Sequence, residues 1–202
     1  MQEAFIGNWT QQSHVSAEQL ASVRGLNRRF LDLAGAGLLT PGPAAQAETL
    51  SPAQRAAAAD CPYALYDLRF EDDAYWGGRL QAPASWRVAD EPPVCPDTID
   101  FARLALFYTW HLALSAGLAA HLLLGIRGST AEAFRRLSVD ALPELALAES
   151  ANLSARWSGC SAYWTALIRA AARPDPAALR RVQLSGLQLA AASQLPSEPR
   201  EV

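Results

Sequence analysis

The sequence contains no lysine, because all seventeen of its basic residues are arginine. Twenty acidic residues leave a formal net charge of -3, so no strong overall field attracts nucleic acid or an anionic membrane. Arginine pairs such as Arg28-Arg29 and Arg135-Arg136 are mixed with acidic residues and form no basic stripe, so we expect no nucleic-acid partner. Arginine without lysine, together with abundant alanine, is typical of a GC-rich bacterial genome.

Cysteine is also scarce in this chain. Cys61, Cys95 and Cys160 are far apart and odd in number, so they provide neither a disulfide framework nor the C-x-x-C spacing of a zinc site. We expect these thiols to be buried small hydrophobic groups in a reducing compartment. The first residues lack a basic segment followed by an apolar one, so we expect no secretory signal peptide and a cytoplasmic protein.

Catalytic signatures are missing as well. The sequence has no E-x-x-H pair for a di-iron site, no H-E-x-x-H, no G-x-S-x-G and no phosphate-binding glycine loop. His111 and His121 would lie about 15 Å apart along one helix, so they could not share a metal ion. These absences disfavour an enzyme and predict no metal or cofactor, although a catalytic site built from unconnected residues would leave no such signature.

Helix signals run through the whole chain. Ser16 and Gln19 have the spacing of a capping box, and the apolar residues after them recur every three or four positions. Further helix starts are indicated by Ser51-Pro52, Asp60-Cys61-Pro62, Ser129 with Glu132, Ser138 and Asp175-Pro176. No stretch shows the alternation that is typical of a strand. The sequence therefore predicts one all-α domain over residues 1–202, a bundle of six to eight helices.

Four segments are predicted to lie outside the helices. Residues 1–15 form an N-terminal arm with Phe5, Ile6 and Trp9 available to dock it, and residues 195–202 form a polar tail. Residues 40–49 are expected to form a loop, because two prolines and a glycine interrupt any helical periodicity. The proline-rich connector 79–97 is longer than most loops in compact domains, and Trp86 or Val94 could anchor it over an opening.

The central helix is predicted at about 98–126, where no formal charge occurs from Leu104 to Ile126. A run of this length could cross a membrane or form the centre of a helical bundle. We favour the bundle, because the surrounding amphipathic helices need an apolar element to cover them. Two rows follow this helix: a bulky seam of Leu104, Phe107, His111, Leu114, Leu118 and Leu122, and a row of mostly small residues at Thr109, Ala113, Gly117 and His121.

The segment 63–76 has the most unusual composition, since five aromatic residues are interspersed with four acidic residues in it. We interpret it as a helix and propose that its aromatic side chains form a contact surface for a protein partner. The alternatives are that these side chains pack in the core, or that the acidic residues hold a divalent cation. The candidate partner-binding residues are Tyr63, Tyr66, Phe70, Tyr75 and Trp76.

The functional prediction follows mainly from the absence of a catalytic pattern. We expect an adaptor, regulator or chaperone-like factor that binds another protein, with a homodimer also compatible with the sequence. The alternative is a pocket for an apolar small molecule near Trp110, His111 and His121, because a polar group in an apolar pocket is typical of ligand sites.

Overall fold

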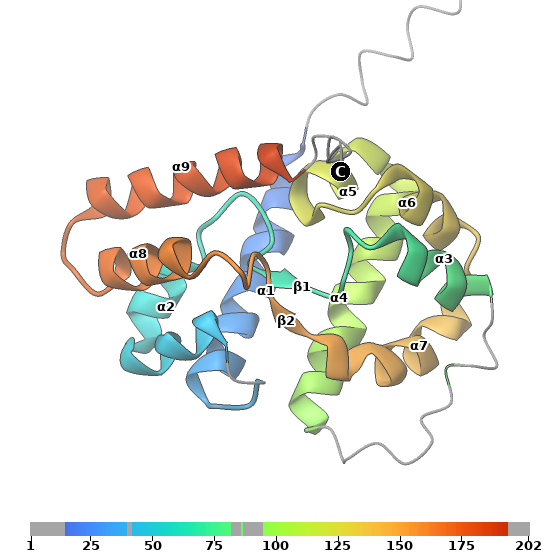
Figure 1. The fold of residues 1–202 in the computed structure, drawn as a ribbon, viewed down its shortest axis with the longest axis horizontal. Coiled ribbons are helices and arrows are strands. Elements are labelled where there is room, and N and C mark those ends of the chain that lie inside the picture. Colours follow the sequence, from blue (N-terminus) through green and yellow to red (C-terminus); the bar gives the residue numbers. More distant parts are fainter. Residues whose placement is uncertain (1–14, 40–41, 82–85, 87–94, 194–202) are drawn as a thin grey trace, which may run out of the picture.

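The computed structural model describes residues 15–39, 42–81, 86 and 95–193, which form two groups of helices joined along α1 and α4. Figure 1 shows α2, α8 and α9 in the group at the left, and α3, α6 and α7 in the group at the right, with α4 between them. The predicted all-α class is confirmed, since every regular element of the described residues is helical except one small sheet. The predicted tail, nearly all of the predicted arm and most of the connector fall outside the described residues.

The first group begins with α1, and three of its helices start where the capping patterns predict. Ser16 and Gln19 bond reciprocally, at 2.9 and 3.1 Å, Ser51 and Gln54 do the same, and the Asp175 carboxylate accepts from the Ala178 N–H at 2.9 Å. The elements are α1 (Ala17–Gly35), η1 (Pro43–Thr49), α2 (Pro52–Ala58), α8 (Ser161–Ala171) and α9 (Pro176–Ala192). The prediction of a loop at 40–49 is wrong for residues 43–49, because short 3-10 turns can start at a proline and need little periodicity.

The second group surrounds α4, which packs against α6 and α7. Its elements are α3 (Asp73–Gln81), α4 (Pro96–Ser115), α5 (Gly117–Leu124), α6 (Gly128–Arg135), η3 (Val139–Ala141), α7 (Leu142–Glu149) and η4 (Ser150–Asn152). Ser138 caps the short turn η3, whereas α7, the helix whose start it was expected to mark, begins without a side-chain cap. The predicted cap at Ser129 is wrong, since α6 already begins at Gly128 and has no side-chain cap.

The predicted helix at 63–76 is wrong for its first ten residues. Residues 66–67 form β1 (Tyr66–Asp67), which pairs antiparallel with β2 (Ser154–Ala155), and α3 begins only at Asp73. The buried side chain of Asn27 in α1 explains the extended backbone: its amide donates to the carbonyl of Tyr63 at 2.8 Å and accepts from the N–H of Leu65 at 2.8 Å. A tertiary contact thus satisfies the backbone groups that a helix would have paired internally.

The predicted central helix is broken in two. Ala116 has φ -157° and ψ 67°, which separates α4 from α5, and α5 ends at Gly125 with φ +76°. Within α4 the small row faces the interior, with Thr109 and Ala113 buried, whereas Gly117 is exposed at the start of α5. The bulky row faces outward, which reverses the expectation that it would form the seam of the core.

Candidate functional site

The predicted aromatic contact surface is not on the surface. Tyr63, Tyr66, Phe70 and Trp76 are fully buried, and Tyr75 is half-buried. The prediction is therefore wrong for four of its five residues, because a side chain without exposed area cannot contact a partner of the folded chain. Tyr63 and Tyr66 are turned inward from extended backbone, whereas Trp76 is buried on the inner face of α3.

Two of these buried rings pack at separate places in the core. Tyr66 lies at the junction of the two helical groups, with its ring centroid 5.1 Å from that of Phe101 and 6.3 Å from that of Phe30. The ring centroid of Trp76 lies 4.9 Å from that of Phe134 in α6. The aromatic content of 63–76 thus reflects packing, which was one of the alternatives considered for it.

The alternative ligand residues do not converge on one pocket. Trp110 donates its indole N–H to the carbonyl of Leu137 at 3.1 Å, whereas His111 is exposed on α4. His121 lies on α5, with Nδ1 at 2.9 Å from the carbonyl oxygen of Ile126. These three side chains face different surroundings, so the structure gives no support to a shared pocket of Trp110, His111 and His121.

Four of the nine exposed large hydrophobic side chains of the described residues lie on the outward row of α4 and α5. Its leucine side chains keep large exposed fractions: 40% for Leu104, 45% for Leu114, 49% for Leu118 and 43% for Leu122. Phe107 is partly exposed between them, and His111 lies at the middle. We call these six residues the leucine row. Large apolar side chains grouped in this way are typical of an interaction surface.

Two hydrogen bonds fix which face of α4 carries the leucine row. On one side the Tyr108 hydroxyl donates to the carbonyl of Gln19 in α1, at 2.8 Å. On the other side the indole of Trp110 reaches Leu137 after the end of α6. The face between these two contacts is turned away from the core, so the exposure of the row is a consequence of how α4 is anchored.

An apolar groove continues from Leu122 toward α9. Its volume is about 310 Å³, and none of its side chains can form a hydrogen bond. The groove is lined by Val15, Leu20, Pro62, Leu122, Leu123, Leu187, Ala190 and Ala191. Leu187 is 41% exposed at its rim. The sequence did not predict this groove, because nothing in the pattern indicates that α5 and α9 approach each other.

A polar basin lies at the beginning of α3, lined by Asp67, Arg69, Glu71, Asp72, Asp73 and Arg127. Behind it is the buried guanidinium of Arg156, whose Nη2 is 3.7 Å from Glu71 Oε1. Burial lowers the pKa of Arg156, although the charges of Glu71 and Asp67 oppose this effect. Burial also raises the pKa of Asp67, against the hydrogen bond from the N–H of Phe70. Arg156 thus acts as the internal counter-charge of this acidic segment.

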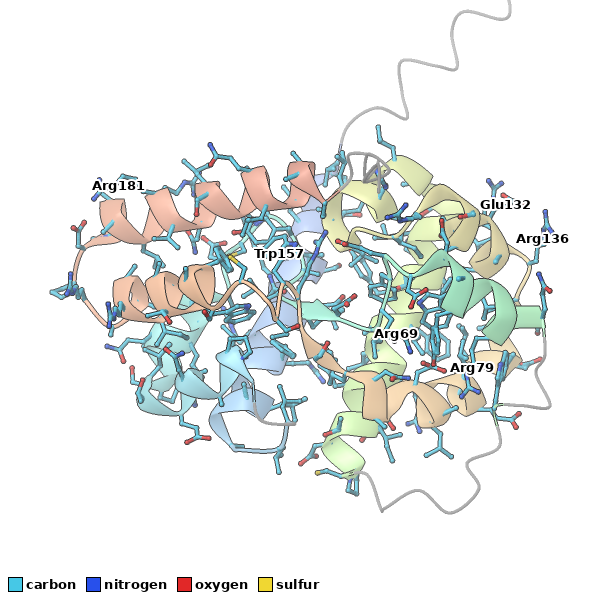
Figure 2. The ribbon with its side chains drawn as sticks, viewed as in Figure 1. Arg69, Arg79, Glu132, Arg136, Trp157 and Arg181 are labelled. Carbon is cyan, nitrogen blue, oxygen red and sulfur yellow. The ribbon has the colours of Figure 1, made fainter. Side chains whose placement is uncertain are left out.

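A second buried carboxylate, Glu149, links α7 to α3. It accepts from Arg79 Nε at 2.6 Å, from the Tyr75 hydroxyl at 2.6 Å and from Asn152 Nδ2 at 2.8 Å. Figure 2 shows Arg79 in the side-chain cluster beside α3 and α7, whereas Glu132 and Arg136 project from the outer edge near α6. Both oxygens of Glu149 accept hydrogen bonds, and these bonds hold α3 and α7 together.

The residues that the structure describes contain neither a cluster of metal ligands nor a membrane-spanning helix. No group of three or more histidine, cysteine or acidic side chains there is placed to hold a metal ion. Within the same ranges, no helix has both the length and the apolar character that a bilayer crossing requires.

Comparison of the chain with models of protein families, with curated proteins and with solved structures finds no match.

Proposed function

We propose that this chain is a non-enzymatic protein-binding factor, of the adaptor or regulator type, and that it contacts its partner through the leucine row. The observation that carries the proposal is the exposure of four leucines, between 40% and 49%, on one face of α4 and α5. Burying about half of a leucine side chain contributes roughly 1 kcal/mol. Several such residues on one face therefore supply a useful part of a binding energy.

The charge distribution favours a protein over a membrane surface as the partner. The chain has no lysine and a net charge of -3, and Asp97 and Asp100 are exposed at the beginning of α4. Helices that lie on anionic membranes normally carry basic residues beside their apolar face. The leucine row has only Arg103 in that position, and this side chain is paired with Asp100 at 2.9 Å.

Site-specific photocrosslinking tests this proposal. A photoreactive amino acid at Leu114 should give a crosslink to a protein in cells that produce the full chain. The matched control is Leu147 of α7, which is 47% exposed but lies outside the row. Crosslinks from position 114 and none from position 147 would support the proposal. No protein adduct at position 114, or equal adducts at both positions, would contradict it.

A second candidate function is the binding of an apolar small molecule in the apolar groove. Its volume of about 310 Å³ and its lack of polar side chains support this candidate. A fluorescent alkyl probe should bind the wild-type chain and lose affinity in Ala191→Trp, because the larger ring fills the groove. Equal binding by both chains would rule out the groove as the site.

A further inference from the structure

The spacing within the leucine row is that of a coiled-coil seam. Within α4, Leu104, Phe107, His111 and Leu114 follow one another at steps of three, four and three residues, and Leu118 and Leu122 follow in α5, after the break at Ala116. This is the a and d pattern by which one helix packs its side chains between those of another. In α4 the positions opposite the row, such as Ala105, Leu106, Thr109, Leu112 and Ala113, are buried in the chain's own core. The seam therefore faces outward and lacks a second helix.

The residues that flank this seam carry almost no charge. The positions beside it in α4 are Arg103, Tyr108, Trp110 and Ser115, and Arg103 is already paired with Asp100. In coiled coils the charges at these flanking positions choose the partner, and like charges keep identical helices apart. A second copy of this face would meet no like charge beside Phe107, His111 and Leu114, and the exposed acids Asp97 and Asp100 lie before Leu104, at the beginning of α4.

The area of the row suits a weak dimer. Four leucines that are 40–49% exposed, with Phe107 and His111 beside them, offer less than the ~800 Å² that each partner of a standard interface buries. The flanking Trp110, Tyr108 and Ser115 extend the same face. Most soluble homo-oligomers are two-fold dimers in which one surface patch contacts itself.

We infer that the partner of the leucine row is a second copy of this chain, and that two copies pair α4 against α4 about a two-fold axis. The inference rests on the proposed function, since both require the leucine row to be a contact surface. His111 then lies within an otherwise apolar seam. A polar residue in such a position fixes the register of the two helices and weakens their association.

Analytical ultracentrifugation of the full chain, between about 1 and about 200 µM, tests the inference. The dimer fraction should rise across this range. Leu114→Gln should weaken the dimer by about tenfold or more, whereas His111→Leu should tighten it by a similar factor. Leu147→Gln, the matched control on α7, should leave the dissociation constant unchanged. Because one variant must gain affinity, misfolding cannot imitate the expected result.

Three results would overturn the inference: a monomer throughout this range, an equal effect of Leu114→Gln and Leu147→Gln, or no gain in His111→Leu. The crosslink from position 114 separates this inference from the proposed function. A product of two copies of this chain supports both. An adduct with a different protein keeps the proposed function and overturns the second copy, and no adduct overturns both.

Discussion

The hydroxyl group of Tyr63 lies against Gly186 of α9, in the space that a β-carbon at this position would occupy. The same hydroxyl donates to the carbonyl of Gln183 at 2.7 Å and lies 2.9 Å from the hydroxyl of Tyr163. Gly186, Gln183 and Ala190 are the buried residues of α9. The buried residues of α9 therefore form a narrow contact with the rest of the chain, and the hydroxyl group of Tyr63 lies at the centre of this contact.

The substitution Gly186→Ala should therefore loosen α9. The added methyl group displaces a buried ring, and overpacking of this kind costs about 1–3 kcal/mol. Thermal unfolding followed by circular dichroism would measure the loss. Gly25→Ala is the matched control, because Gly25 lies within α1 with open space around it, and alanine is the better helix former. Equal melting temperatures for the two variants would contradict the prediction.

The substitution Glu149→Ala should destabilise the fold strongly. It leaves Arg79, with only 19% of its side chain exposed, without the carboxylate that neutralises it. Removing one partner of a buried ion pair costs about 3–5 kcal/mol, and the partial exposure of Arg79 favours the lower value. Urea denaturation would measure the change. Glu144→Ala on the same helix removes an exposed carboxylate and should have little effect.

The carboxyl groups of Asp67 and Asp72 should give opposite pH dependences of stability. Burial raises the pKa of Asp67 above 3.8, whereas the hydrogen bond from the Tyr75 N–H and the pairing with Arg69 lower the pKa of Asp72. The contribution of Asp67 is complete below pH 3.8 and is lost as the pH rises through its folded-state pKa. The contribution of Asp72 is present above pH 3.8 and is lost as the pH falls through its folded-state pKa.

Urea denaturation of Asp67→Asn and Asp72→Asn between about pH 3 and about pH 7 checks these signs. The asparagine at position 67 keeps an oxygen for the Phe70 N–H, which donates at 3.0 Å in the wild type. Relative to Asp67→Asn the wild type should lose stability as the pH rises, and relative to Asp72→Asn it should gain. The same sign in both comparisons would refute the assignment.

The substitution Gly125→Ala should be more harmful than Gly37→Ala. Both glycines have a left-handed backbone, with φ +76° and +68°, so both variants carry the same conformational cost. A β-carbon at Gly125 would also collide with the Arg156 guanidinium, whereas at Gly37 the nearest atom, on Glu48, is 3.8 Å away. The difference between their free energies of unfolding, measured in urea, isolates the contact with Arg156. No difference would show that Arg156 moves aside freely.

The sequence predicted the helices best where local chemistry decides. The caps at Ser16, Ser51 and Asp175 lie where the patterns placed them, because a cap depends on residues within three positions. The segment 63–72 was misread, since its backbone is held by Asn27, more than thirty positions earlier. A long-range hydrogen bond leaves no periodic signal.

The leucine row was recognised in the sequence, but it was expected to face the core and it faces outward. The two rows of the central run were visible in the sequence, but bulk suggested that the leucines faced the core. Thr109 and Ala113 of the small row are buried instead, because helices approach closely where side chains are small. Arg28 and Asp32 also have the spacing of an ion pair on one helix, but it is Arg55 of α2 that reaches Asp32, at 2.9 Å. Helical spacing could not reveal that competitor.

The short sheet between β1 and β2 bears on how this chain reaches its native state. Tyr66 pairs with Ala155, about 90 positions further along, and closing a loop of that length costs about 4 kcal/mol in chain entropy. Helices such as α1 and α8 are local and can form within microseconds. The pairing of the strands and the seating of Arg156 must wait for both halves of the chain. The slowest step in acquiring the structure should therefore be the meeting of its two distant halves, whatever the speed of its helices.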